Sequence, residues 1–258
     1  MAYVMYYKRH RNILIENHRA IFFFIPKAGC SSLKAKLAEV LEMEKTKDFP
    51  EDIHKPQLYP FPFVKKDELT SVYRDYFRFT ICRNPWSRIV SCFKDKIRPA
   101  EYNGEGFTDG VALPLQRFEA FYGGMSFTEF VEAVCKIPDS EADHHFQSQT
   151  YQLVNSKGEL LVNYIGKLET MERSLEDIHQ KTGLQLRDAK RLNVTGARKS
   201  YHEFYSPALS KAIGARFSAD IELLKYHFQP GLSIESIGVV NEKWPTHFYN
   251  SGLVAKTV

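Results

Sequence analysis

Residues 21–33 have the sequence Ile21-Phe22-Phe23-Phe24-Ile25-Pro26-Lys27-Ala28-Gly29-Cys30-Ser31-Ser32-Leu33. The first five are apolar and favour a β-strand, and the turn that follows is rich in small residues. Beyond the turn the spacing is helical, with apolar Leu33 and Leu37 on one face and charged Lys34 and Lys36 on the other. The pattern predicts a buried strand, a tight turn and a helix that continues to about Met43.

A strand, a small-residue turn and a helix N-terminus together favour anion binding, because the N–H groups and the dipole of the first helical turn attract negative charge. Lys27 adds a positive charge, and Ser31 and Ser32 add hydroxyl donors. The alternative is an ordinary turn with a surface lysine. We expect a phosphate or sulfate site made of Pro26, Lys27, Ala28, Gly29, Cys30, Ser31 and Ser32.

The turn differs from the phosphate loop of nucleotide kinases. That loop is Gly-x-x-x-x-Gly-Lys-[Ser/Thr], in which the lysine directly precedes the helix and a hydroxyl binds magnesium. Here Lys27 precedes Gly29, which is the only glycine of the turn. A small-molecule kinase stays open as an alternative, but the sequence lacks its lysine.

A second strand–turn–helix unit begins at residue 77. Residues 77–82 are typical of a strand, and Pro85 suits the first turn of the helix that follows. Ligands of open α/β sheets bind at the carboxyl ends of the strands. Arg83 there offers a fork of donors to a phosphate, and Ser91, two turns into the helix, can add a hydroxyl.

Length and composition suit one α/β domain with helical and loop insertions. The chain has 258 residues, of which 43% are hydrophobic and 14% aromatic, enough for a substantial core. The net charge of +4 suits an anionic ligand but falls short of a nucleic-acid-binding protein. We expect a single domain over residues 1–258, with a lead-in (1–19), a core (20–228) and a C-terminal extension (229–258).

The cysteines and the N-terminal sequence indicate in which cellular compartment the protein is expected. Cys30, Cys82, Cys92 and Cys135 form no CxxC pair and no zinc spacing, so we expect four reduced thiols and no metal site. No signal peptide is evident, and no segment approaches the ~20 apolar residues of a membrane span. We expect a cytoplasmic protein, while a longer parent from which an anchor was removed stays open.

The remaining patterns predict further elements along the chain. They are a short helix over 66–76, a flexible insertion over 98–113 that could face an acceptor, a capped helix beginning at Ser126, a polar cluster over 143–149, a strand over 164–167, a helix stopped by Gly183, a basic loop over 192–201 and a helix from Pro207 through Leu224.

Two motifs carry a family resemblance. Pro-Lys-x-Gly-x-Ser-Ser at 26–32 resembles the 5′-phosphosulfate loop of sulfotransferases that use PAPS (3′-phosphoadenosine 5′-phosphosulfate). Arg-Asn-Pro-x-x-Arg-x-x-Ser at 83–91 resembles their 3′-phosphate site. The order of the pieces over 20–228 is similar to the carbohydrate sulfotransferase family (sulfotransferase family 2) that includes chondroitin 4-O- and HNK-1 sulfotransferases and bacterial relatives. The matching pieces include His145-Phe146-Gln147-x-Gln149, Ile165-Gly166-Lys167-Leu168-Glu169 and Ala219-Asp220-Ile221.

The resemblance implies a PAPS sulfotransferase fold, with a P-loop-like central parallel sheet flanked by helices. It also implies transfer of a sulfuryl group from PAPS, as co-substrate, to a hydroxyl of a carbohydrate or glycoconjugate. Lys27 would neutralise the departing phosphate, while Arg83 and Ser91 would hold the 3′-phosphate. No metal is implied, and the missing anchor favours a soluble, bacterial-type member. A module that binds a nucleotide or a sulfated glycan without catalysis stays open.

An acceptor hydroxyl needs a base, and histidine is the usual one near neutral pH. We expect His54 in this role, because many sulfotransferases place a histidine ahead of the 3′-phosphate strand; the alternative is a solvated loop histidine. His145 is the second candidate. Arg198 and Lys199 either face the nucleotide or an anionic acceptor, or form a solvated loop. The acceptor and the oligomeric state are not indicated by the sequence.

Overall fold

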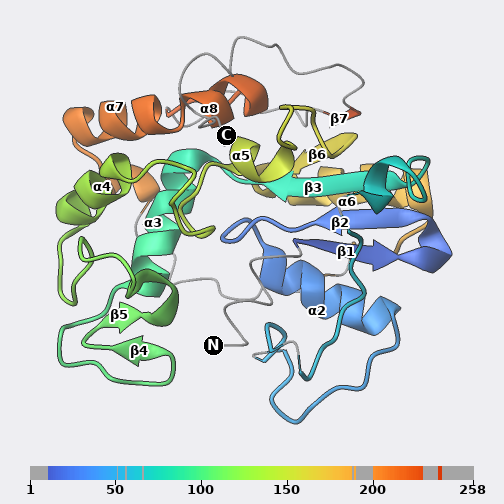
Figure 1. Ribbon diagram of the computed structural model, residues 1–258, viewed down its shortest axis with the longest axis horizontal. Helices are drawn as coiled ribbons and strands as arrows, with labels where there is room; N and C mark the ends of the chain where they lie inside the picture. The colour runs from blue at the N-terminus through green and yellow to red at the C-terminus, as the bar shows by residue number, and fades with distance from the viewer. Residues whose placement is uncertain are drawn as a thin grey trace. The chain divides into compact units, whose positions relative to one another are not determined.

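The computed structural model describes residues 11–50, 52–55, 57–65, 67–187, 189, 200–228 and 238–239. The chain forms two compact units (Figure 1). The first takes its segments from 1–82, 153–194 and 234–244, and the second from 83–152, 195–233 and 245–258. Each unit is described by itself, and a single domain over the whole chain stays a prediction. Arg198 and Lys199 lie outside the described residues.

The first unit is built on a five-stranded sheet with the order β1-β2-β3-β6-β7 (Figure 1). Strands β2, β3 and β6 are parallel, and β1 and β7 are antiparallel edges. The predicted central sheet is therefore confirmed as a mostly parallel one, and the carboxyl ends of its three parallel strands lie at one edge. The strands are β1 (Asn12–Ile15), β2 (Ala20–Phe23), β3 (Phe77–Cys82), β6 (Tyr164–Lys167) and β7 (Gly238–Val239).

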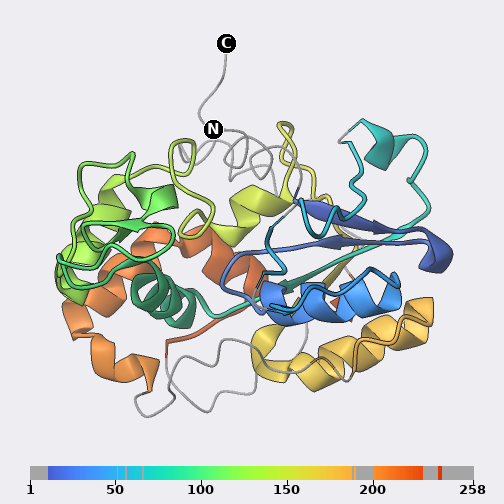
Figure 2. The same ribbon diagram turned by 90° about the horizontal axis from the view of Figure 1, so that it is seen from below.

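Helices α2 (Cys30–Val40) and α6 (Met171–Thr182) cover one face of this sheet (Figure 2). Their apolar residues pack in one core with Phe22 of β2 and Phe79 of β3, whose rings stack with centroids 5.2 Å apart. All four residues of β2 are buried, as expected for a parallel central strand covered on both faces. Gly183 ends α6 at φ +71°, as the sequence predicts.

The helix predicted over 66–76 is wrong. The structure has only a 3₁₀ turn, η2 (Glu68–Thr70), followed by further turns. Turn hydrogen bonds stand in place of helical ones, with the Ser71 and Tyr73 N–H groups both donating to the Glu68 carbonyl. Side chains also tie the segment to residues outside it: the Arg78 guanidinium donates to the Leu69 carbonyl at 3.1 Å, and the Tyr76 hydroxyl donates to Glu16 at 2.5 Å. Helical spacing was present, but these partners lie outside the segment and override it.

The second unit is mainly helical, and α3, α4 and α7 pack on one another. Its described elements are α3 (Pro85–Lys96), β4 (Phe107–Thr108), β5 (Val111–Ala112), α4 (Phe127–Lys136), most of α5 (Gln149–Leu153), η5 (Tyr201–Phe204), α7 (Pro207–Arg216) and α8 (Ser218–Leu224). The capping box of Ser126 is confirmed. The predicted insertion over 98–113 contains the β4–β5 hairpin, and the predicted last helix is broken in two at Phe217.

Candidate functional site

The turn between β2 and α2 has the backbone of an anion cradle. Lys27 and Gly29 both have positive φ, +68° and +80°. Gly29 is the N-cap of α2, and in this described helix the cap supplies no side-chain acceptor and the first turn holds no acidic residue. The positive end of the helix dipole is therefore not neutralised from within the helix, and an external anion would be stabilised there.

Two features favour glycine at position 29. Its φ of +80° is strained for any residue with a Cβ, and a Cβ built there would lie 3.0 Å from both Leu168 Cδ1 and Met171 Cε. Leu168 belongs to η4 (Leu168–Thr170), which directly follows β6. The segment after β6 thus packs against this turn.

The structure brings Ser31 and His54 together. The Ser31 hydroxyl, in the first turn of α2, lies 2.8 Å from His54 Nε2. His54 is half-buried, and its loop is fixed by the buried side chain of Ile53 and by an Asp52 carboxylate that accepts from Thr46 at 2.6 Å. The predicted base is therefore held with its ring nitrogen against the predicted cradle.

Two lysines near these elements are buried, which the sequence did not predict. Lys34 was expected on the charged face of α2, yet it is 2% exposed, and its Nζ lies 3.8 Å from the Phe24 ring centroid. Burial lowers its pKa to about 8. Lys167, at the carboxyl end of β6, is equally buried, and burial lowers its pKa as well. The expected face for Lys34 is wrong because both sides of α2 are covered near its start.

The second motif begins where β3 ends. The Asn84 side chain caps α3 by accepting from the Ser87 N–H, and the Arg83 Nε donates to the Ser87 hydroxyl at 2.9 Å. Ser91 lies in the same helix and is buried. Arg88, by contrast, is buried and donates to two carbonyls of the loop over 143–149, so it has a structural role.

Sequence reasoning gave Gln149 and Asp220 no role. The Gln149 amide bonds both backbone groups of Arg83, and the Asp220 carboxylate accepts from the N–H groups of Gln149 and Thr150 at 2.9 and 2.7 Å. Only the resemblance marked these two positions. No local pattern indicates that Gln149, 66 positions beyond Arg83, bonds to it, or that Asp220, 71 positions beyond Gln149, bonds to Gln149.

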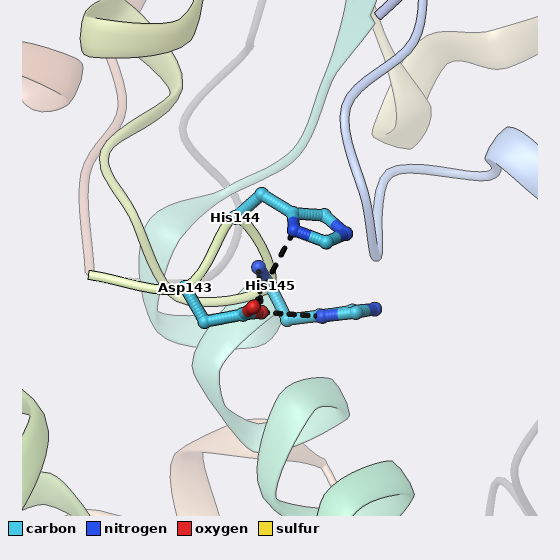
Figure 3. A group of neighbouring side chains, drawn as sticks. All are labelled: Asp143, His144 and His145. Atoms are coloured by element: carbon cyan, nitrogen blue, oxygen red, sulfur yellow. Dashed lines mark hydrogen bonds and ion pairs between the residues drawn. The ribbon is translucent and has the colours of Figure 1, made fainter. Parts of the chain in front are cut away.

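A cluster of Asp143, His144 and His145 lies in the same unit (Figure 3). Asp143 accepts from His145 Nδ1 at 2.6 Å, and His144 Nδ1 lies 3.5 Å from its other oxygen. Because an ionised carboxylate only accepts, His145 carries its proton on Nδ1 and keeps a lone pair on Nε2. This is the arrangement of an oriented base, and it leaves His145 as the second candidate.

Burial governs the charge of this cluster. Burial lowers the pKa of His145 well below its usual value, and the nearby Lys96 and His144 lower it further, against the opposing effect of Asp143. For Asp143, burial alone would raise the pKa, but hydrogen bonds from the two histidines outweigh burial and lower it. His145 is therefore neutral at neutral pH.

The same three residues are a group, among the residues described, whose donor atoms converge enough to hold a metal ion, all within 4.8 Å. Two nitrogen or oxygen ligands of one tetrahedral zinc ion lie about 3.4 Å apart. The 2.6 Å separation of His145 Nδ1 and the Asp143 oxygen is instead that of a hydrogen bond. The cluster as it stands is a hydrogen-bonded dyad with a neighbouring histidine.

The fold and these motifs define an α/β protein with a candidate anion-binding turn after its first parallel strand. The chain matches the model of the Sulfotransferase family over residues 10–227, and it belongs to that family. Across the described residues, no helix is both long and apolar enough to cross a membrane. No solved structure matches the chain.

Curated relatives agree with the family. Carbohydrate sulfotransferase 10 of Homo sapiens is 25% identical over 239 residues, covering 84% of this chain and 67% of the relative. The Xenopus laevis protein of the same name is 26% identical over the same coverage. Carbohydrate sulfotransferase 12 of Xenopus laevis is 25% identical over 194 residues, covering 62% of this chain and 45% of the relative.

Proposed function

We propose that this protein transfers a sulfuryl group from PAPS to a hydroxyl of a carbohydrate acceptor. Membership of the sulfotransferase family supports the reaction, and the names of the relatives support a carbohydrate acceptor. The observation that carries the proposal is the 2.8 Å contact between Ser31 and His54. It places the Nε2 atom of His54 beside the N-terminus of α2, where the sulfuryl group would lie and where an acceptor hydroxyl would approach it.

The cradle would bind the 5′-phosphosulfate. The N–H groups of the first turn of α2, together with the Ser31 and Ser32 hydroxyls, would donate to the sulfate and phosphate oxygens. Lys27 would neutralise charge on the leaving phosphate. Sulfuryl transfer, like phosphoryl transfer, has little covalent work for the protein to do, so positioning and charge stabilisation dominate. We therefore propose that the fold is P-loop-like, in that the turn between β2 and the N-terminus of α2 binds the phosphosulfate.

Arg83 and Ser91 would bind the 3′-phosphate of the donor. A guanidinium offers paired donors to a phosphate, and a hydroxyl one turn or two away adds another. Arg198 and Lys199 would face the nucleotide or an anionic acceptor. The assignments of Arg83 and Ser91 rest on the motif at 83–91 and its resemblance to the family, and that of Arg198 and Lys199 rests on the basic composition of the loop over 192–201.

His54 would act as the general base. The acceptor oxygen attacks sulfur while the bond between sulfur and the bridging phosphate oxygen breaks. The hydroxyl proton passes to Nε2 of His54. The product PAP (3′-phosphoadenosine 5′-phosphate) leaves, carrying the additional negative charge beside Lys27. Each atom is accounted for by the donor, the acceptor and one histidine, and the chain's own cationic and N–H groups supply the charge stabilisation.

The test is sulfuryl transfer from PAPS to a panel of oligosaccharides in EDTA, with the wild type, His54→Ala and His179→Ala. His179 is a half-buried histidine of α6 that bonds the Leu184 carbonyl, and it controls for loss of an imidazole. We expect His54→Ala to lose 10²–10⁴-fold in kcat and to keep PAP binding. A protein that binds PAP but never turns over would be the non-catalytic module, and turnover only with ATP and magnesium would be a kinase.

A further inference from the structure

The backbone of Arg83 is held at two points by one side chain. Gln149 Oε1 accepts from the Arg83 N–H at 2.9 Å, and Gln149 Nε2 donates to the Arg83 carbonyl at 2.8 Å. The N–H needs an acceptor and the carbonyl needs a donor, so the orientation of the amide is fixed by its partners. The Gln149 amide thus pairs both backbone groups of Arg83, as the backbone of a neighbouring strand does in a β-sheet.

The amide is itself anchored from α8. The Asp220 carboxylate accepts from the Gln149 and Thr150 N–H groups, the first turn of α5, and lies 3.4 Å from Gln149 Nε2. Gln149 and Asp220 are both fully buried. A buried polar network with its partners in place is stiff, because each broken bond would leave a polar group unsatisfied in a medium of low dielectric.

We propose that Gln149 and Asp220 are positioning residues that aim the Arg83 side chain at the 3′-phosphate of the donor. The inference rests on the proposed function, which assigns that phosphate to Arg83. Paired donation from a guanidinium depends on direction, so the backbone from which it projects must be fixed. The Arg83 Nε bond to the Ser87 hydroxyl fixes the far end of the same side chain.

A pair of ligands isolates this effect. PAP and adenosine 5′-phosphate differ only in the 3′-phosphate, so the ratio of their affinities measures the contact made to that group. We expect Arg83→Ala to lower the ratio at least tenfold and Gln149→Leu to lower it about fivefold to tenfold. In the double variant Arg83→Ala/Gln149→Leu the affinity ratio should be no lower than in Arg83→Ala alone, because Gln149 acts through Arg83.

The matched control is Gln147→Leu. Gln147 is a buried amide in the same loop, and it donates to the Asp139 carbonyl rather than to Arg83. A structural disturbance of the loop would weaken the binding of PAP and of adenosine 5′-phosphate equally, whereas loss of positioning would weaken the binding of PAP alone. If Gln149→Leu does not fold, as judged by circular dichroism, Asp220→Asn carries the same test with a smaller expected loss of about threefold to fivefold.

The outcomes separate the two claims. A lowered ratio in Gln149→Leu, with the control unchanged, supports positioning. The positioning role is overturned if the ratio of PAP affinity to adenosine 5′-phosphate affinity stays at its wild-type value in Gln149→Leu but falls in Arg83→Ala. The proposed function then remains intact. A wild type that binds adenosine 5′-phosphate as tightly as PAP overturns the assignment of Arg83 to a 3′-phosphate, and the inference falls with it.

Discussion

Ser31 and His54 are 23 positions apart in the chain and share a hydrogen bond of 2.8 Å. If His54 is the base and Ser31 lines the sulfate site, the two act as a unit. Removing either should then cost turnover, and removing both should cost less than the sum. We expect a coupling free energy of about 1 kcal/mol or more in a double-mutant cycle of kcat/KM with Ser31→Ala and His54→Ala.

The control for this cycle is Ser32→Ala. Ser32 is the neighbouring hydroxyl and is more buried than Ser31. If the coupling is specific to Ser31, the pairing of Ser32→Ala with His54→Ala should be additive within about 0.5 kcal/mol. Equal coupling for both serines would argue against a specific Ser31–His54 unit.

Gly29→Ala should disturb the cradle twice, through backbone strain and through the 3.0 Å approach to Leu168 and Met171. We expect a loss of about 2 kcal/mol in the free energy of unfolding and weaker PAP binding. Gly183→Ala is the control, since φ is +71° there but the nearest atom lies 4.0 Å away. It should lose about 1 kcal/mol and bind PAP as the wild type does. Chemical denaturation and titration calorimetry measure both quantities.

Lys34→Met should stabilise the protein at pH 7. Each pKa unit corresponds to about 1.4 kcal/mol, so lowering the pKa from 10.5 to about 8 costs the charged lysine roughly 3 kcal/mol in the folded state. Between pH 8 and 10.5 the unfolded chain binds this proton more than the folded one, and stability rises with pH. The advantage of Lys34→Met in urea denaturation should therefore shrink toward pH 10. A constant advantage would mean that Lys34 does not titrate in this range.

His145 should make stability depend on pH below about 6.5. Its pKa is depressed in the folded state, so below the unfolded value the unfolded chain takes up the proton first, and stability falls as pH falls. The slope approaches about 1.4 kcal/mol per pH unit at most. Asp143, whose pKa is lowered, loses its contribution only below about pH 4 and does not enter this range.

The measurement is urea denaturation of the wild type and His145→Gln at pH 7, 6 and 5. The groups that face His145, namely Asp143, His144 and Lys96, are present in both proteins. We expect a flatter pH dependence for the variant. Identical slopes would show that His145 titrates normally in the folded protein.

Local patterns predicted the elements that carry the motifs. The strand over 77–82 and the strand over 164–167 match β3 and β6, because apolar runs with β-branched and aromatic residues have few other stable places in an α/β protein. The N-cap residues likewise marked α4 and α7 correctly. Periodicity failed over 66–76, where partners outside the segment decide the structure.

The candidate site was predicted only where its residues form a continuous stretch of sequence. The residues of the cradle follow from one continuous motif, and their turn has the expected backbone. Gln149 and Asp220 could not be assigned, because their role depends on hydrogen bonds to Arg83 and to each other across 66 and 71 positions. The burial of Lys34 was missed because four consecutive residues near the start of α2, Ser32 to Ala35, are all buried, which an amphipathic pattern does not indicate.

The most direct test is isothermal titration of the wild type with PAP in EDTA, compared with ATP and magnesium, and repeated with Arg83→Ala. We predict micromolar binding of PAP without metal, weaker binding of ATP with magnesium, and PAP binding weakened at least tenfold in the variant. Binding of ATP with magnesium in preference to PAP would contradict the assignment of PAPS as the donor.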